Sequence, residues 1–119
     1  MSAIRCLETV RFGGITAGLA RILTTLERAA SIWAGQPDTI WITAGSDGHH
    51  SPNSRHYRFE AIDVRVKNFP SASAIERFRG LWTEFLADTA PGRFTLLLED
   101  PNTGNQHFHC QVKKGTSFP

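Results

Sequence analysis

Two amphipathic stretches, separated by short β-rich runs, constrain the fold of this chain more than any other feature. In residues 16–34 apolar side chains recur at the three- and four-residue spacing of a helix that buries one face. Thr16 is placed to cap this helix and Gly35 to end it. A second helix is expected from Ser73, because Glu76 three residues later completes a capping box.

Four short runs rich in β-branched and aromatic residues are expected to form strands. They are residues 39–43, 58–66, 94–98 and 107–112. The first two are separated by a run of turn-forming and polar residues, which reads as a loop at 44–55. The order helix, two strands, helix, two strands, with short connections, predicts an α+β fold with a small, mainly antiparallel sheet and two helices.

The size and composition indicate a single globular domain. A chain of 119 residues is too short for two domains, and 40% hydrophobic with 20% charged residues is ordinary for a folded soluble protein. We expect one domain over residues 1–119, with poorly ordered ends at 1–14 and 113–119. Cys6 and Cys110 form no CxxC pair and are expected to be reduced thiols.

Charge and hydropathy exclude two classes of partner. The net charge is only +2 and the basic residues are scattered, so the footprint of a nucleic-acid-binding protein is missing. No apolar run approaches the ~20 residues that span a bilayer, and the first residues do not resemble a signal peptide. We therefore expect synthesis in the cytoplasm, with separate delivery if the protein acts outside it.

All five histidines lie in two short segments and none lies on a predicted helix: His49, His50, His56, His107 and His109. In a strand, alternate side chains share a face, so His107 and His109 are expected to point to one side while Cys110 points to the other. Two exposed histidines on an edge strand are the structural alternative. Clustering favours a metal site, because metal ligands must converge and other histidines need not.

Asp63 is the second unusual feature, because it lies between Ile62 and Val64 in a predicted strand. A carboxylate in an apolar strand is costly unless it is paired or coordinates a metal. His56 precedes Asp63 by seven residues, an odd separation, so His56 must lie in the preceding loop and fold back. Two histidines and one carboxylate, with a fourth position for water, are typical of a catalytic zinc site.

These residues resemble a known signature. Ser54, His56, Ala61 and Asp63 match S-x-H-x-x-G-x-A-x-D, with the late strand supplying H-x-H. This pattern resembles the zinc DD-peptidases, D-alanyl-D-alanine carboxypeptidases and L-alanyl-D-glutamate endopeptidases that share the Hedgehog fold. The likeness spans residues 40–112 and is closest to short members of phages and prophages. The family's glycine is Phe59 here, which implies a different local turn or a filled pocket.

The resemblance implies a ligand set and a catalytic group. His56, Asp63 and His109 would bind one zinc ion per chain, and His107 would take the place of the acid/base or transition-state-stabilising residue. Glu99 is the other candidate acid/base, because it ends the preceding strand and the intervening turn could return it to the site. A solvated charge at the strand end is the alternative for Glu99.

Further residues of the signature region would contact the substrate. Ser54 would orient the site. His50 or Arg58 would replace the substrate-holding arginine of larger members, and Tyr57 could hydrogen-bond the substrate, although packing is the more common role of such a residue. For His49 we expect a solvated loop position.

The resemblance implies a zinc metallopeptidase that hydrolyses an amide bond in peptidoglycan stem or cross-link peptides, as a phage endolysin does in cell wall degradation. Two alternatives remain open. One is a non-catalytic, zinc-containing, Hedgehog-like binding module, and the other is a zinc hydrolase acting on another amide. Retention of His107 favours catalysis, because a degraded site would be expected to keep its ligands and lose its acid/base.

Overall fold

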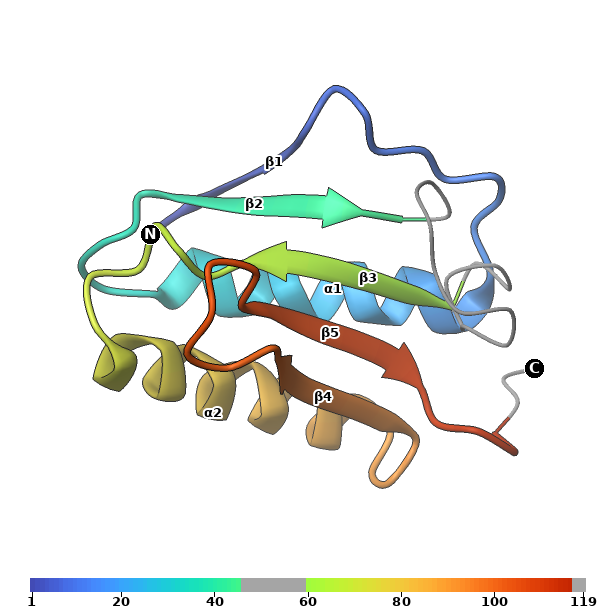
Figure 1. The fold of residues 1–119 in the computed structure, drawn as a ribbon. Helices are drawn as coiled ribbons and strands as arrows, with labels where there is room; N and C mark the ends of the chain where they lie inside the picture. The colour runs from blue at the N-terminus through green and yellow to red at the C-terminus, as the bar shows by residue number, and fades with distance from the viewer. Residues whose placement is uncertain (46–59, 117–119) are drawn as a thin grey trace.

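The computed structural model describes residues 1–45 and 60–116, which form one five-stranded sheet and two helices (Figure 1). Along the chain the elements are β1 (Ala3–Cys6), α1 (Ala17–Ile32), β2 (Thr39–Ala44), β3 (Ala61–Arg65), α2 (Ala72–Thr89), β4 (Phe94–Glu99) and β5 (His107–Val112). The strands lie side by side in the order β1-β2-β3-β5-β4. The predicted α+β class is confirmed.

The sheet is mixed, so the prediction of a mainly antiparallel sheet is wrong. β1 pairs in parallel with β2, whereas the pairings of β2 with β3, β3 with β5 and β4 with β5 are antiparallel. The difference comes from β1, a four-residue strand inside the segment 1–14 that we expected to be poorly ordered. A parallel pair needs a long crossover, and α1 supplies it between β1 and β2.

The helices begin at residues whose side chains cap them. Thr16 Oγ1 accepts a hydrogen bond from the Leu19 amide at 3.1 Å, as the sequence predicted. For α2 the cap is Ser71 rather than Ser73, because the extended Ser71 backbone lets its Oγ accept from the Ala74 amide at 3.1 Å. Neither helix is long and apolar enough to cross a membrane.

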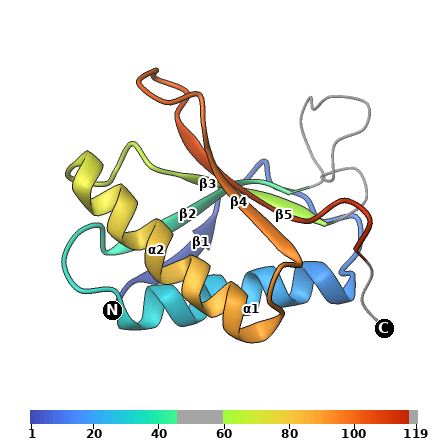
Figure 2. The same cartoon turned by 90° about the horizontal axis from the view of Figure 1, so that it is seen from below.

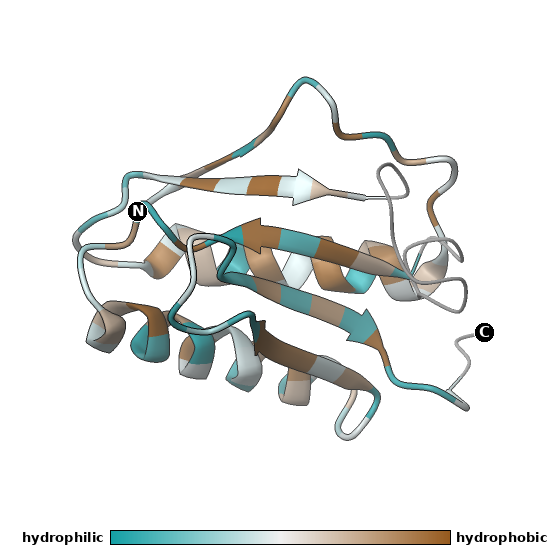
Figure 3. Ribbon diagram, in the orientation of Figure 1, coloured by the Kyte–Doolittle hydropathy of each residue, from teal (hydrophilic) through white to brown (hydrophobic). Residues whose placement is uncertain are grey.

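Both helices cover the same face of the sheet (Figure 2). The opposite face, over which neither helix lies, is called the open face below. Hydropathy alternates along β3 and β5, so each strand presents apolar residues to the helices and polar residues to the open face (Figure 3). Ile62 and Val64 of β3 and Phe108 of β5 are fully buried on the helix side. The polar side chains between them therefore gather on the open face.

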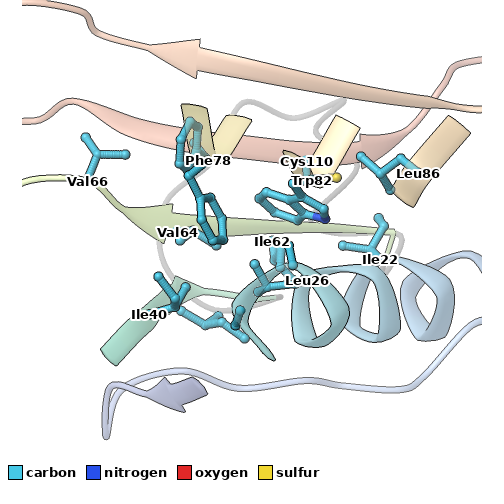
Figure 4. Packing of buried hydrophobic residues seen from close by; sticks show 14 of the residues in the cluster. Ile22, Leu26, Ile40, Ile62, Val64, Val66, Phe78, Trp82, Leu86 and Cys110 are labelled. Atoms are coloured by element: carbon cyan, nitrogen blue, oxygen red, sulfur yellow. The ribbon is translucent and has the colours of Figure 1, made fainter. Parts of the chain in front are cut away.

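The core lies between the sheet and the two helices (Figure 4). Phe78 and Trp82 of α2 pack on Phe108 of β5, with ring centroids 6.1 and 6.2 Å apart respectively. Leu26 of α1 contributes to the same cluster, as does Cys110, which points away from the open face as the alternation predicted. Burial raises the pKa of the Cys110 thiol, so it stays neutral inside the core.

One hydrogen bond joins the two helices inside this core. The indole Nε1–H of Trp82 donates to Thr25 Oγ1 at 3.1 Å, and both residues are buried. Thr25→Val keeps the shape of the side chain but leaves the indole without its acceptor. We expect the free energy of unfolding to fall by about 1–3 kcal/mol. The measurement is a urea denaturation curve monitored by circular dichroism.

Thr24→Val is the matched control, because the Thr24 hydroxyl bonds only the exposed Ala20 carbonyl. This variant should change the free energy of unfolding by less than about 0.5 kcal/mol. Equal losses in the two variants would show that the buried hydrogen bond between the helices contributes nothing beyond helix propensity.

Candidate metal centre

The polar face of the sheet aligns acidic and imidazole side chains from three adjacent strands. Asp63 of β3 is paired in register with His109 of β5. In the neighbouring row, Arg65 of β3 is paired with His107 of β5, which is paired in turn with Glu99 of β4. Because residues two apart in a strand share a face, His107 and His109 both reach the carboxylates of the flanking strands.

His109 is held between two oxygen acceptors. Its Nδ1 lies 2.9 Å from Asp63 Oδ1 and its Nε2 lies 2.7 Å from Gln111 Oε1. Asp63 and His109 are both buried, at 9% and 7% exposure. The ring is thus fixed at both nitrogens, with Nδ1 directed at the carboxylates and Nε2 directed away from them.

The same contacts set the protonation of His109. Burial lowers its pKa, but the hydrogen bonds to Asp63 and Gln111 and the charges of Asp63 and Glu99 outweigh this effect, so the pKa lies above the ordinary value. A metal ion bound at Nδ1 would have to displace the proton that is donated to Asp63.

His107 forms a second carboxylate–imidazole pair beside the first. Its Nδ1–H donates to the Asn105 carbonyl at 2.6 Å, and its Nε2 lies 3.1 Å from Glu99 Oε1. The same Nε2 is 3.9 Å from Asp63 Oδ2, so the two pairs are adjacent. Since the Asn105 carbonyl fixes the Nδ1 proton, Nε2 is the nitrogen that can exchange a proton with Glu99.

Asp63, Glu99 and His109 could together hold a metal ion, because their ligand atoms all lie within 4.8 Å of one another. Ligand atoms on one tetrahedral zinc are about 3.3 Å apart at bond lengths near 2.0 Å. The distances from His109 Nδ1 to Asp63 Oδ1 and to Glu99 Oε1 are 2.9 and 3.9 Å, on either side of that value. The donor set, one imidazole and two carboxylates, fits a divalent ion such as zinc.

A polar cleft of about 500 Å³ opens beside these residues. Asp63, Glu99 and His107 line it together with Arg65 and Lys67. Residues of the turn that precedes β5 also line it. A peptide entering this cleft would therefore meet the carboxylates and the imidazole directly.

Four of the residues singled out in the sequence lie together at this centre: Asp63, Glu99, His107 and His109. The other five, predicted as a ligand or as substrate contacts, lie outside the described residues: His50, Ser54, His56, Tyr57 and Arg58. Glu99 was considered only as an acid/base or a solvated charge, but it belongs to the described group that could hold a metal. Gln111 was missed, although its place two residues after His109 puts it on the same face.

Gln111 orients His109, and its loss should weaken metal binding. Gln111→Leu removes the acceptor that holds Nε2–H, so Nδ1 is no longer fixed as the ligating nitrogen. We expect zinc affinity to fall about 10- to 100-fold, measured by competition with a chromophoric chelator. Gln111→Glu keeps an oxygen acceptor and should retain most of the affinity; equal losses in both variants would exclude this orienting role.

No protein-family model and no curated protein matches the chain. A proposal about function therefore rests on the side chains of the open face of the sheet and on the sequence pattern of residues 54–63 and 107–109.

Proposed function

We propose that this protein is a zinc-dependent peptidase that hydrolyses an amide bond in peptidoglycan stem or cross-link peptides. The observation that carries the proposal is that Asp63 and His109, two potential ligands, lie together beside an open polar cleft, with the Glu99 carboxylate within 4.8 Å of their ligand atoms. A structural zinc site is typically closed by four protein ligands, whereas a catalytic site leaves a position for water or substrate. A centre that lines a cleft is suited to the second arrangement.

Asp63 and His109 would hold the ion, with His56 as the third ligand that the sequence pattern implies. Bound zinc would lower the pKa of a coordinated water toward about 7 and polarise the carbonyl of the substrate. The buried Asp63 carboxylate would offset the positive charge of the ion, and Gln111 would keep the His109 ring in the orientation that presents Nδ1.

Glu99 and His107 would handle the protons. Their side chains share one hydrogen bond of 3.1 Å, so a proton taken up by the pair can rest on Glu99 Oε1 or on His107 Nε2. The pair can accept a proton from the attacking water and return it to the leaving amine, which is general acid–base catalysis. His107 stays oriented throughout, because its Nδ1–H is held by the Asn105 carbonyl.

The cell-wall substrate is supported by the resemblance of residues 54–63 and 107–109 to the zinc DD-peptidases. A peptide of the wall is also polar, which suits a cleft lined by charged and polar side chains. We propose that the protein acts on the wall once delivered there, in the manner of a phage endolysin. The alternative is a zinc-containing binding module that uses the same ligands without turning over a substrate.

Digestion of purified peptidoglycan tests this function. The protein reconstituted with one equivalent of zinc should release new amino groups and stem-peptide fragments, detected by mass spectrometry, and a chelator should stop the release. Release that persists in the presence of chelator would contradict a zinc mechanism. Stoichiometric zinc binding with no peptide cut would favour the binding module.

A further inference from the structure

β4 is the last strand of the sheet, and among residues 1–45 and 60–116 no strand pairs with its outer edge (Figure 1). The outer edge of such a strand presents backbone N–H and C=O groups with which another chain can pair. Proteins commonly block an exposed edge with a lysine, a proline or a bulge. β4 contains neither lysine nor proline, and its register with β5 continues from Phe94 to Glu99 without a bulge. The strand therefore has none of these three blocks.

One hydrogen bond identifies the backbone groups of β4 that point to this outer edge. The Lys113 amide, just after β5, donates to the Arg93 carbonyl at 2.9 Å. Bonding alternates along an antiparallel pair, so the odd-numbered residues of β4 bond to β5 and the even-numbered ones point the other way. The backbone groups that point outward belong to Phe94, Leu96 and Leu98.

The side chains at this edge are apolar on both faces of the sheet. On the helix side, Phe94, Leu96 and Leu98 are only partly buried against the core. On the open face, Leu97 is 43% exposed. An apolar hollow of about 170 Å³ lies between β4 and α2, and small residues of α2 such as Ala87 help to line it. The hollow leaves room beside the edge for side chains of another strand.

We propose that the outer edge of β4 binds a second copy of this chain, with the two β4 strands antiparallel, so that the two sheets continue into one. Charge complementarity indicates this occupant. Arg93 and Glu99 lie three residues on either side of Leu96. A two-fold axis at Leu96 therefore places Arg93 of each copy opposite Glu99 of the other, as in an isologous interface. This pairing is independent of the proposed peptidase function.

The same register satisfies both alternations of the strand. It pairs Leu96 with Leu96 and Phe94 with Leu98 of the second copy, so outward-pointing backbone groups meet outward-pointing groups. Arg93 and Glu99 are both odd-numbered, so their opposed side chains lie on the same face, the open face. A register shifted by two residues would keep the alternation but lose this pair of opposite charges.

Sedimentation velocity over a dilution series of the intact chain measures the association. One strand pairing buries less area than a standard interface, so we expect a reversible dimer with a Kd of about 10–100 µM. Hydrogen exchange followed by nuclear magnetic resonance locates the surface. The Leu96 and Leu98 amides should lose protection on dilution, whereas the Thr95 and Leu97 amides, which face β5, should stay protected.

Leu97→Lys is expected to weaken the dimer at least about 30-fold, because two half-exposed leucines lose their contacts and lysine is a common block of an edge. Ile32→Lys is the matched control. Ile32 is 59% exposed at the end of α1, so the same chemical change is made away from β4. This variant should keep the parent Kd, and the far-ultraviolet circular dichroism of both variants should match that of the parent chain.

Arg93→Glu and Glu99→Arg test the register. Each places like charges opposite one another at both ends of the interface and should raise the Kd about 5- to 30-fold. The double variant restores opposite charges across the axis and should return the Kd close to that of the parent. The two residues lie about 20 Å apart along one strand, so this rescue cannot arise within one copy. Arg5→Glu, exposed on β1 at the other edge of the sheet, is the control and should leave the Kd unchanged.

Three results would overturn the proposed pairing. The first is a parent chain that stays monomeric up to about 1 mM. The second is a dimer that folded Leu97→Lys retains, because such a dimer uses another surface. The third is a double charge variant that is folded but associates no better than the single variants. A dimer that is lost in Leu97→Lys and restored by the charge exchange supports the β4 interface, whether or not the protein cuts a peptide.

Discussion

Replacing Asp63 with asparagine is expected to abolish stoichiometric zinc binding and peptide hydrolysis together. The amide has nearly the shape of the carboxylate but lacks its charge, so it cannot balance a divalent ion. Changes to groups that only orient a ligand already cost about 10- to 100-fold in metal affinity. Loss of a ligand itself should lower zinc affinity by more than this. The two effects are measured as zinc content after equilibrium dialysis and as release of amino groups from peptidoglycan.

Asp100→Asn is the control for this substitution. Asp100 is exposed in the turn after β4 and has a positive φ of 49°, a conformation that asparagine also adopts readily. The variant removes one negative charge close in sequence to Glu99 but outside the cleft. It should bind zinc and cut peptide like the parent chain, and a folded Asp63→Asn protein that still binds one zinc tightly would rule out Asp63 as a ligand.

Glu99→Gln and His107→Ala are expected to give the second largest effect, with zinc binding largely retained. General acid–base catalysis contributes about 10²- to 10⁴-fold, so each substitution should lower kcat by that order. The two side chains share one hydrogen bond, so they should act as a unit. The double variant should therefore lose little more activity than the more impaired single variant.

The zinc content of these variants distinguishes proton transfer from metal binding. If Glu99→Gln loses zinc to the same degree as Asp63→Asn, Glu99 is a ligand and His107 alone handles the proton. Full peptide release by His107→Ala would contradict the proposed mechanism. Glu84→Gln, at an exposed position on α2, makes the same chemical change far from the cleft and should leave kcat unaltered.

Those parts of the candidate metal centre that depend on the residue pattern of a single strand could be predicted from the sequence. The alternation in β5 placed His107 and His109 on one face, and a carboxylate within the apolar run of β3 marked Asp63 as paired or ligating. These inferences depend only on the two-residue repeat of a strand and on the cost of burying a charge. They needed no knowledge of which strands are neighbours.

The remaining contacts depend on strand order, which the local pattern does not determine. Glu99 meets His107 because β4 pairs with β5 in a register that aligns the two residues. Arg65 faces the same cleft because β3 lies on the other side of β5. A sequence pattern assigns a face to each residue but does not give this register, so the alignment of all three strands could not be anticipated.

Two features of the fold were missed for local reasons. β1 is only four residues long, and three of these are exposed and none is buried, so it has no clear apolar alternation. It is stabilised as a strand by pairing with β2, a contact between residues more than thirty positions apart. At α2 the sequence predicted a cap at Ser73, but the extended backbone of Ser71, two residues earlier, makes Ser71 the cap.

A crystal structure of the protein equilibrated with zinc, with diffraction data collected at the zinc absorption edge, tests the central claim most directly. The proposed centre predicts one strong anomalous peak per chain. The zinc ion at this peak should be bonded to an Asp63 carboxylate oxygen and to His109 Nδ1 at about 2.0–2.2 Å. An anomalous peak elsewhere on the chain, with Asp63 and His109 still hydrogen-bonded to each other, would contradict it.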